Sequence, residues 1–169
     1  MRAKQILALV VLLLVAFLIV YPPLANGNVK IAASSSSPVD VEHLYLTISE
    51  ISAHRTDTRE PSGWFTVTNQ SSRIDLASVN STQTIGLGSV SVGQYDMVRV
   101  RITNATAVAN STSKRVQLPS TVFTIPVSFL VQLGPQTVVR LKIVPDVQET
   151  PEVITLRLSF TAIQENHAP

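Results

Sequence analysis

Apolar and polar residues alternate over most of the chain from Val39 onward, and this period of two constrains the fold more than any other feature of the sequence. Strands place successive side chains on opposite faces, whereas a helix repeats its apolar positions about every 3.6 residues. The clearest case is Ile154–Ala162, in which every second residue is apolar and the residues between are Thr, Arg, Ser and Thr. Strands with one apolar and one polar face indicate antiparallel sheets that pack on a shared core.

This alternation, together with the turn signals between the runs, predicts seven to nine strands. The predicted strands are Leu44–Ala53, Trp64–Thr68, Arg73–Leu76, Gly88–Val92, Val98–Thr103, Arg115–Leu118, Phe123–Gln132, Val139–Ile143 and Ile154–Ala162. The predicted turns are Pro61–Gly63, Gly93, Gly134–Pro135 and Pro145–Asp146. The alternation changes phase after Ile48, which predicts a bulge at Ser49 and Glu50. Pro126 has no amide hydrogen to donate, so we expect its strand at a sheet edge or at a bulge.

The length of 169 residues suits a single core. A sandwich is commoner than a barrel at this size. The predicted fold class is therefore all-β, an antiparallel β-sandwich of seven to nine strands preceded by one N-terminal hydrophobic helix. We expect a signal-anchor or signal peptide over residues 1–27, a Ser-rich flexible linker over 28–38 and an extracytoplasmic sandwich domain over 39–165.

The N-terminal helix is predicted from an apolar run over Ile6–Tyr21, which Arg2 and Lys4 precede. This arrangement inserts with its basic end in the cytoplasm, so the rest of the chain lies outside. The run lies between the hydrophobic region of a signal peptide, about 7–15 residues, and a spanning helix of about 17–25. We favour a retained, single-pass anchor. Small residues at Ala25 and Gly27 also allow cleavage and secretion, and a pilin-like leader processed after Ala3 is a third, weaker alternative.

The segment after the apolar run contains four consecutive serines, Ser34–Ser37, followed by Pro38. Such a polar stretch of small residues is typical of a flexible linker between membrane and domain. The alternative is that Val29–Ala33 forms a strand donated to the sheet of a neighbouring subunit.

Charge and cysteine content exclude several classes of protein. The formal net charge is +2, but three of the 13 basic residues, Arg2, Lys4 and Lys30, flank the apolar run. The remainder is close to neutral, which argues against a nucleic-acid partner. The chain has no cysteine. Disulfides, thiolate metal sites, a cysteine nucleophile and a lipid-modified cysteine anchor are therefore excluded.

The order of several short motifs resembles a known family. These motifs are Leu44–His54, Gly63-Trp64, Ile74–Leu76, Gly93–Tyr95 leading into Val98–Val100, and Phe123–Val127. In this order they resemble the extracytoplasmic family called domain of unknown function 4382, over about Val41–Val144. The resemblance implies a secreted or anchored β-sandwich of bacteria or archaea, without an established active site. Bacterial relatives often carry a lipid-modified cysteine, so anchorage of this cysteine-free chain would depend on the apolar run.

Candidate chemical sites are few. Asn-x-Ser/Thr sequons predict possible N-glycosylation at Asn69, Asn80, Asn104 and Asn110; the alternative is four ordinary surface asparagines. The chain has three histidines, His43, His54 and His167, and the first two lie at opposite ends of one predicted strand. They are too far apart to share a hydrolase site, so we expect no catalytic residue and no enzymatic activity.

Metal and cofactor sites are not expected either. His43 with Glu42 or Asp40 lacks a second ligand cluster. The loop with Thr56, Asp57, Thr58 and Glu60 offers oxygen ligands, but it has no calcium-binding rhythm and contains two arginines. Trp64 and Phe65 are adjacent on a predicted strand, so one should point inward. We favour Trp64 in the core; the alternative is an exposed ring that stacks on a sugar or a partner surface.

These observations favour a membrane-tethered or secreted cell-surface domain with a binding or structural role in the envelope and without catalysis. Its expected partners are the membrane, through the N-terminal helix, and envelope proteins, glycans or further copies of itself. One alternative is a subunit of an extracellular filament or surface array assembled by strand donation. A second, weaker alternative is an exported hydrolase.

Overall fold

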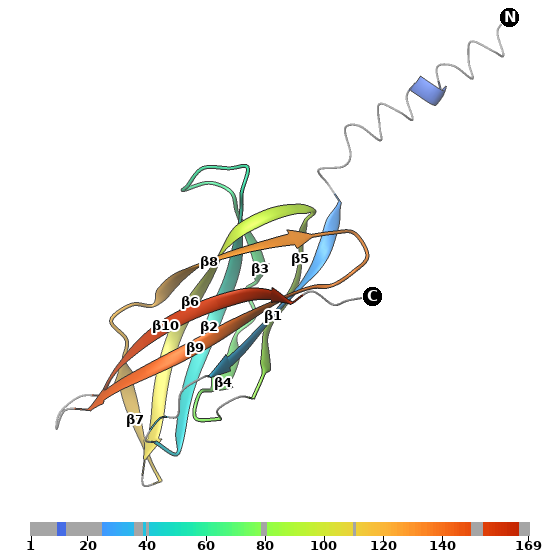
Figure 1. Cartoon of the computed structure of the whole chain (residues 1–169). Coiled ribbons are helices and arrows are strands. Elements are labelled where there is room, and N and C mark those ends of the chain that lie inside the picture. Colours follow the sequence, from blue (N-terminus) through green and yellow to red (C-terminus); the bar gives the residue numbers. More distant parts are fainter. Residues whose placement is uncertain are drawn as a thin grey trace, which may run out of the picture.

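The computed structural model describes residues 10–12, 25–35, 39, 41–78, 81–109, 111–149 and 154–165. In this part of the chain the protein is all-β (Figure 1). The strands are β1 (Asn26–Ser35), β2 (His43–Arg55), β3 (Trp64–Thr68), β4 (Ser72–Asp75), β5 (Gln83–Ser91), β6 (Gly93–Ala109), β7 (Thr112–Gln117), β8 (Val122–Val131), β9 (Thr137–Glu149) and β10 (Ile154–Glu165). The all-β prediction is confirmed.

The strands form two sheets. Sheet A has the order β5-β1-β9-β10. Sheet B is centred on β2 and β6; β3 and β4 pair with the free side of β2, and β7 and β8 with the free side of β6. β7 also pairs briefly with β10 and so connects the two sheets. The β1–β9 and β7–β10 pairs are parallel, so the prediction of purely antiparallel sheets is wrong for these two pairs.

The predicted apolar faces meet in one core between the sheets. Buried residues of this core include Leu44, Leu46, Ile48, Val98, Val100, Ile102, Ile125, Val127, Phe129, Val139, Leu141 and Ile143. Near the start of β6 the buried rings of Tyr95 and Phe129 stack with their centroids 5.2 Å apart. The Tyr95 hydroxyl donates a hydrogen bond to the Ser91 carbonyl oxygen at 2.7 Å, so the buried phenol keeps a partner. Burial raises the pKa of Tyr95.

Two local irregularities lie where the sequence predicts them. The pairing of β2 with β6 shifts register between Ile48 and Glu50, which confirms the bulge. Pro126 lies on β8, which pairs with β6 opposite Met97, next to another register shift. β8 is an edge strand of sheet B, as a proline in the ladder requires.

The expected flexible linker over residues 28–38 is wrong for residues 28–35, because β1 covers Asn26–Ser35. Val29, Ile31 and Ala33 alternate into the core and are fully or almost fully buried. β1 pairs antiparallel with β5 and parallel with β9 of its own chain. The two partners satisfy the backbone on both sides, so small polar residues such as Ser34 are accommodated in an interior strand. This strand is missing from the predicted set and brings the number of strands in the described part of the chain to ten rather than seven to nine.

A second correction concerns the expected turn at Pro145–Asp146. β9 continues through both residues, and Pro145 is buried opposite Leu158 of β10. At Pro145, β9 pairs with β10 on one side only, so the other side of the strand accommodates a residue without an amide hydrogen.

Of the predicted N-terminal helix, only residues 10–12 are described, as a single short helical segment. The longer helix is not supported by this segment, and the rest of the apolar run lies outside the described residues. Among the described residues, no helix has the length and apolar character required to cross a membrane.

Glycines allow β5 of sheet A to approach β3 of sheet B closely. A Cβ atom on Gly88 would lie 1.7 Å from the carbonyl oxygen of Val67, and one on Gly86 would lie 3.0 Å from side-chain atoms of Ile51 and Thr68. Any side chain at position 88 would therefore collide with the backbone of β3. This contact brings the two sheets together along one long edge, and β8 and β10 lie side by side along the other edge.

Candidate functional site on the outer face of sheet B

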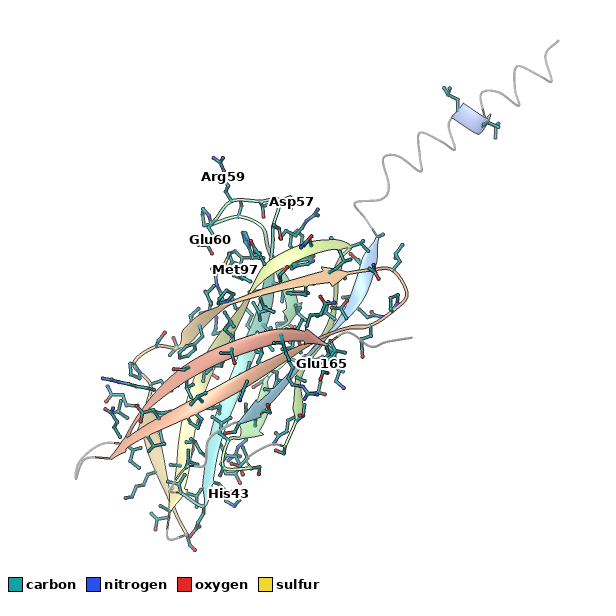
Figure 2. All side chains as sticks on the ribbon, viewed as in Figure 1. His43, Asp57, Arg59, Glu60, Met97 and Glu165 are labelled. Atoms are coloured by element: carbon teal, nitrogen blue, oxygen red, sulfur yellow. The ribbon has the colours of Figure 1, made fainter. Side chains whose placement is uncertain are left out.

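The outer face of sheet B carries the polar side chains that alternate with the buried ones on β2 and β6. On β2 the buried residues Leu44 and Leu46 alternate with His43, Tyr45 and Thr47, which face outward. β6 adds Arg99 and Arg101 to the same face, β3 adds Trp64, and β4 adds Arg73 and Asp75. Figure 2 shows His43 at one end of this face and Asp57, Arg59 and Glu60 in the loop beyond the other end. We call this surface the outer B face.

The first cluster lies at the start of β2. The Nδ1 atom of His43 lies 2.7 Å from Oδ2 of Asp75, and the His43 ring stacks on Tyr45 with centroids 5.3 Å apart. The guanidinium carbon of Arg73 lies 3.8 Å from the centre of the Tyr45 ring. Asp75 also accepts hydrogen bonds from the backbone N–H groups of Leu44 and Ala77.

The carboxyl group of Asp75 is the titratable group of this cluster whose pKa is shifted. Burial alone would raise its pKa, because burial disfavours the charged form. The hydrogen bonds from His43, Leu44 and Ala77 and the charge of His43 outweigh burial, so the pKa of Asp75 lies below its ordinary value. Asp75 is therefore held as a carboxylate that fixes the ring of His43.

The second cluster lies at the end of β2. The Nδ1 atom of His54 lies 2.7 Å from Oδ1 of Asp96, and the His54 ring packs against Trp64 with centroids 5.1 Å apart. The guanidinium of Arg99 lies 3.7 Å from the centre of the Trp64 ring, and its Nη2 atom lies 3.5 Å from Oε1 of Glu60. His54 itself is only 2% exposed.

The two clusters thus repeat one arrangement at opposite ends of a single strand. In each, an aspartate holds a histidine through Nδ1, an aromatic ring packs on the histidine, and an arginine covers the aromatic ring. Between them the ion pair of Arg101 and Glu50, 3.1 Å apart, crosses from β6 to β2. The cations lie beside carboxylates or aromatic rings. The outer B face therefore presents ordered side chains of both positive and negative charge, and not a strong electrostatic potential of one sign.

Several nitrogen atoms of the second cluster are buried without a hydrogen-bond partner among the described residues: His54 Nε2, Trp64 Nε1 and Arg99 Nε. An aspartate oxygen accepts from Nδ1 of His54, so Nε2 of the neutral ring is an acceptor. Its burial places this atom out of contact with solvent. The cluster therefore fixes the local geometry of β2, β3 and β6 and presents Arg99 and Asp96 at the surface.

The prediction that Trp64 lies in the core is wrong. Phe65 packs against the core and meets Tyr95 edge-on, with centroids 6.3 Å apart, whereas Trp64 lies on the outer B face. The alternative, an exposed Trp64 ring free to stack on a partner, is not found either, because the Arg99 guanidinium covers the ring. Sequence reasoning missed both histidine–aspartate pairs, because Asp75 and Asp96 lie 32 and 42 residues from their histidines. Only the register of β2 with β4 and β6 brings them together.

The remaining predicted site residues are dispersed. Asn69 and Asn104 are exposed, Asn69 just after β3 and Asn104 on β6, while Asn80 and Asn110 lie outside the described residues. His167 and Asp40 also lie outside them. In the β2–β3 loop, Asp57 pairs with Arg55 and Glu60 pairs with Arg99. The part of the chain that the structure describes contains no group of three or more His, Cys, Asp or Glu residues placed to hold a metal ion.

Comparison with known proteins places the chain in a family of unknown function. No curated protein and no solved structure matches it. A family model described as "Domain of unknown function (DUF4382)" matches residues 26–162, from the first residue of β1 into β10. The match confirms the resemblance found in the sequence and extends it to include β1. The chain therefore belongs to the DUF4382 family.

Proposed function

We propose that this protein is an extracytoplasmic domain, tethered to a membrane by its N-terminal apolar run, that binds envelope components through the outer B face and performs no catalysis. In its finer form the proposal is a β-sandwich preceded by one hydrophobic helix, with secretion after cleavage of the leader as the alternative. The single observation that carries the binding role is the pair of matched clusters on the outer B face. Strands, rather than loops, hold the histidine, the aspartate and the arginine of each cluster.

The fixed positions of these side chains support a role in binding rather than in catalysis. Side chains already ordered before binding lose little conformational freedom on association, so preorganised surfaces bind more tightly than mobile ones. A hydrolytic role would require a histidine nitrogen within reach of a substrate proton. In the second cluster this nitrogen would be Nε2 of His54, which is buried. The geometry of this cluster therefore favours a binding surface.

The position of β1 favours a separate domain over a subunit assembled by strand donation. β1 fills a place between β5 and β9 of its own chain, along most of its length. A strand donated to a neighbour would have to leave this place, where Val29 and Ile31 are fully buried, and a second copy would have to fill it with its own β1. Until that exchange, exposure of the two side chains would cost about 1.5–3 kcal/mol each.

The location is tested by labelling on intact cells. The chain has no native cysteine. A single Asp57→Cys substitution in the exposed β2–β3 loop therefore gives one reactive thiol, and Phe129→Cys in the core gives a matched buried control. We expect a membrane-impermeant maleimide to label position 57 on intact cells and position 129 only after denaturation. Labelling at position 57 only after lysis would contradict the proposed location.

The binding role is tested by comparing the two outer faces. The double variant Arg73→Ala/Arg99→Ala removes one cation from each cluster, and Lys142→Ala/Arg157→Ala removes two exposed cations from the outer face of sheet A. We expect the full chain to migrate in a larger assembly on native gels of gently solubilised envelopes, and we expect the first variant, but not the second, to lose that assembly. Equal behaviour of the two variants would contradict a binding role for the outer B face. Thermal melts of both variants check that each remains folded.

A further inference from the structure

The end of the sandwich where β1 begins gathers exposed apolar side chains. Leu133, in the loop between β8 and β9, is 64% exposed, and Leu130, near the end of β8, is 43% exposed. The backbone N–H of Leu130 donates a hydrogen bond to the side chain of Gln164, so the end of β10 lies against β8. We call this end of the molecule, with Leu130 and Leu133, the leader-proximal end.

Packing fixes the leader-proximal end against the start of β1. A Cβ atom on Gly27 would lie 2.3 Å from the carbonyl oxygen of Gln132, so the β8–β9 loop touches the first residues of β1. Ala25 is also held there, because its carbonyl oxygen accepts a hydrogen bond from the N–H of Val92. In Figure 1 this loop curves past the start of β1, at the end from which the chain continues toward its N-terminus.

The sequence between the apolar run and this end is short. Only Pro22, Pro23 and Leu24 separate Tyr21, the last residue of the run, from Ala25. A chain spans at most about 3.3–3.6 Å per residue, so Ala25 lies within roughly 14 Å of the end of the run whatever the conformation between them. A run that spans a bilayer therefore holds the leader-proximal end at the lipid surface.

The β8–β9 loop has the chemistry that such a position requires. Its residues, Gln132–Gln136, carry no charge. Gly134 adopts φ 92°, a left-handed conformation that favours glycine and allows the loop to turn tightly. Leu133 projects from a turn without cost to the core, and an apolar side chain gains free energy when it enters the boundary between headgroups and acyl chains. Single exposed leucines are common, but this one lies beside the point of attachment.

We infer that the leader-proximal end rests on the lipid surface of the membrane that holds the apolar run, with the Leu133 side chain inserted among the headgroups. This inference rests on the tether proposed above and adds an orientation to it. The long axis of β6 then points away from the membrane, because β6 starts at Gly93 beside this end and runs for 17 residues to Ala109. At about 3.3 Å per residue, the β6–β7 turn lies on the order of 50 Å farther out.

The test uses the full chain in liposomes with one introduced cysteine carrying an environment-sensitive fluorophore. Leu133→Cys is the test position. Ser111→Cys, in the β6–β7 turn, is the far-end control, and Leu87→Cys is a matched leucine, 59% exposed on the outer side of β5. We expect the probe at 133 to shift its emission to the blue and to lose most of its intensity to lipids that carry a nitroxide quencher. The probe at 111 should show neither effect, and the probe at 87 a smaller one.

Flotation of the same samples separates the two proposals. If the chain floats with the liposomes but the probe at 133 is no more quenched than the probe at 111, the orientation is wrong and the tether stands. If the chain does not float, the tether is wrong and the orientation falls with it. All three positions are on the surface, so the substitutions leave the core intact.

Discussion

The Nδ1 atom of His54 lies 2.7 Å from the Oδ1 atom of Asp96, and this bond joins a buried imidazole on β2 to a partly exposed carboxylate on β6. The bond anchors the second cluster of the outer B face, since the other ring nitrogen of His54 has no partner among the described residues. The buried His54 ring therefore depends on this one side-chain hydrogen bond, because at 2% exposure it has no access to water that could replace the bond.

Asp96→Ala should destabilise the protein by about 1–3 kcal/mol, because it leaves a buried imidazole N–H without an acceptor. The control is Asp57→Ala, which removes a carboxylate that is 61% exposed and pairs with Arg55 at the surface. Such surface ion pairs contribute about 0–1 kcal/mol. Urea unfolding of both variants measures the difference, and a loss in Asp96→Ala no greater than that in Asp57→Ala would count against the anchoring role.

The stability of the protein should fall at acid pH partly through Asp75. Its pKa is lower in the folded protein than the ordinary value of an aspartate side chain, so the folded state gains stability from the charged carboxylate. This contribution is complete above the unfolded pKa and disappears as the pH falls through the folded one. Asp75→Asn cannot titrate, so its free energy of unfolding should decline less steeply below about pH 4. Urea unfolding from neutral pH to pH 2.5 measures both curves, and parallel curves would contradict this assignment.

Gly88→Ala should destabilise the sandwich by about 1–3 kcal/mol or more, as overpacking does at rigid sites. The added Cβ would collide with the Val67 carbonyl oxygen, which belongs to the backbone and cannot rotate away as a side chain can. Ser89→Ala, at the exposed neighbouring position, is the control and should be close to neutral. Thermal unfolding followed by circular dichroism compares the two. A Gly88→Ala variant that melts with the wild type would show that β5 and β3 can separate at no cost.

A chain that begins at Ala25 should fold, and a chain that begins at Ser36 should not. The shorter chain lacks β1 and with it the buried side chains Val29, Ile31 and Ala33. Full burial of a valine or isoleucine contributes about 1.5–3 kcal/mol, so the loss is a large part of the 5–15 kcal/mol that holds a typical domain together. Cooperative melting of the shorter chain near the temperature of the longer one would contradict a structural role for β1.

Periodicity predicted those parts of the fold in which one face of a strand is apolar and the other polar. β2, β6 and β8 satisfy this rule, and so do the bulge after Ile48 and the edge position of Pro126. β1 was missed because its composition of Asn, Ala and Ser resembles that of a linker, although Val29 and Ile31 already alternate. Pro145 was misread as a turn for a related reason: a proline interrupts a strand only where the neighbour on the side of its nitrogen needs an amide hydrogen.

The candidate site was less predictable than the fold. Sequence reasoning identified His43 and His54 and placed them at opposite ends of one strand, as they are. Their aspartate partners come from β4 and β6, and local sequence carries no information about which residues a strand register sets opposite each other. The predicted orientation of Trp64 was wrong for a similar reason. Both members of the Trp64-Phe65 pair are apolar, so the choice of inward residue depended on Tyr95 and Arg99, which lie on another strand.

The parallel pairing of β1 with β9 constrains the order of folding. β1 is made first, yet its neighbours are Gln83–Ser91 and Thr137–Glu149, so sheet A cannot close until nearly the whole chain has been synthesised. Contacts between such distant segments form slowly, because a large loop must be ordered before they are made. A nascent chain thus keeps Val29 and Ile31 without their β9 neighbour while sheet B, whose strands all lie within residues 43–131, can already assemble. Chaperones that hold nascent chains would find their binding segment at the N-terminal strand.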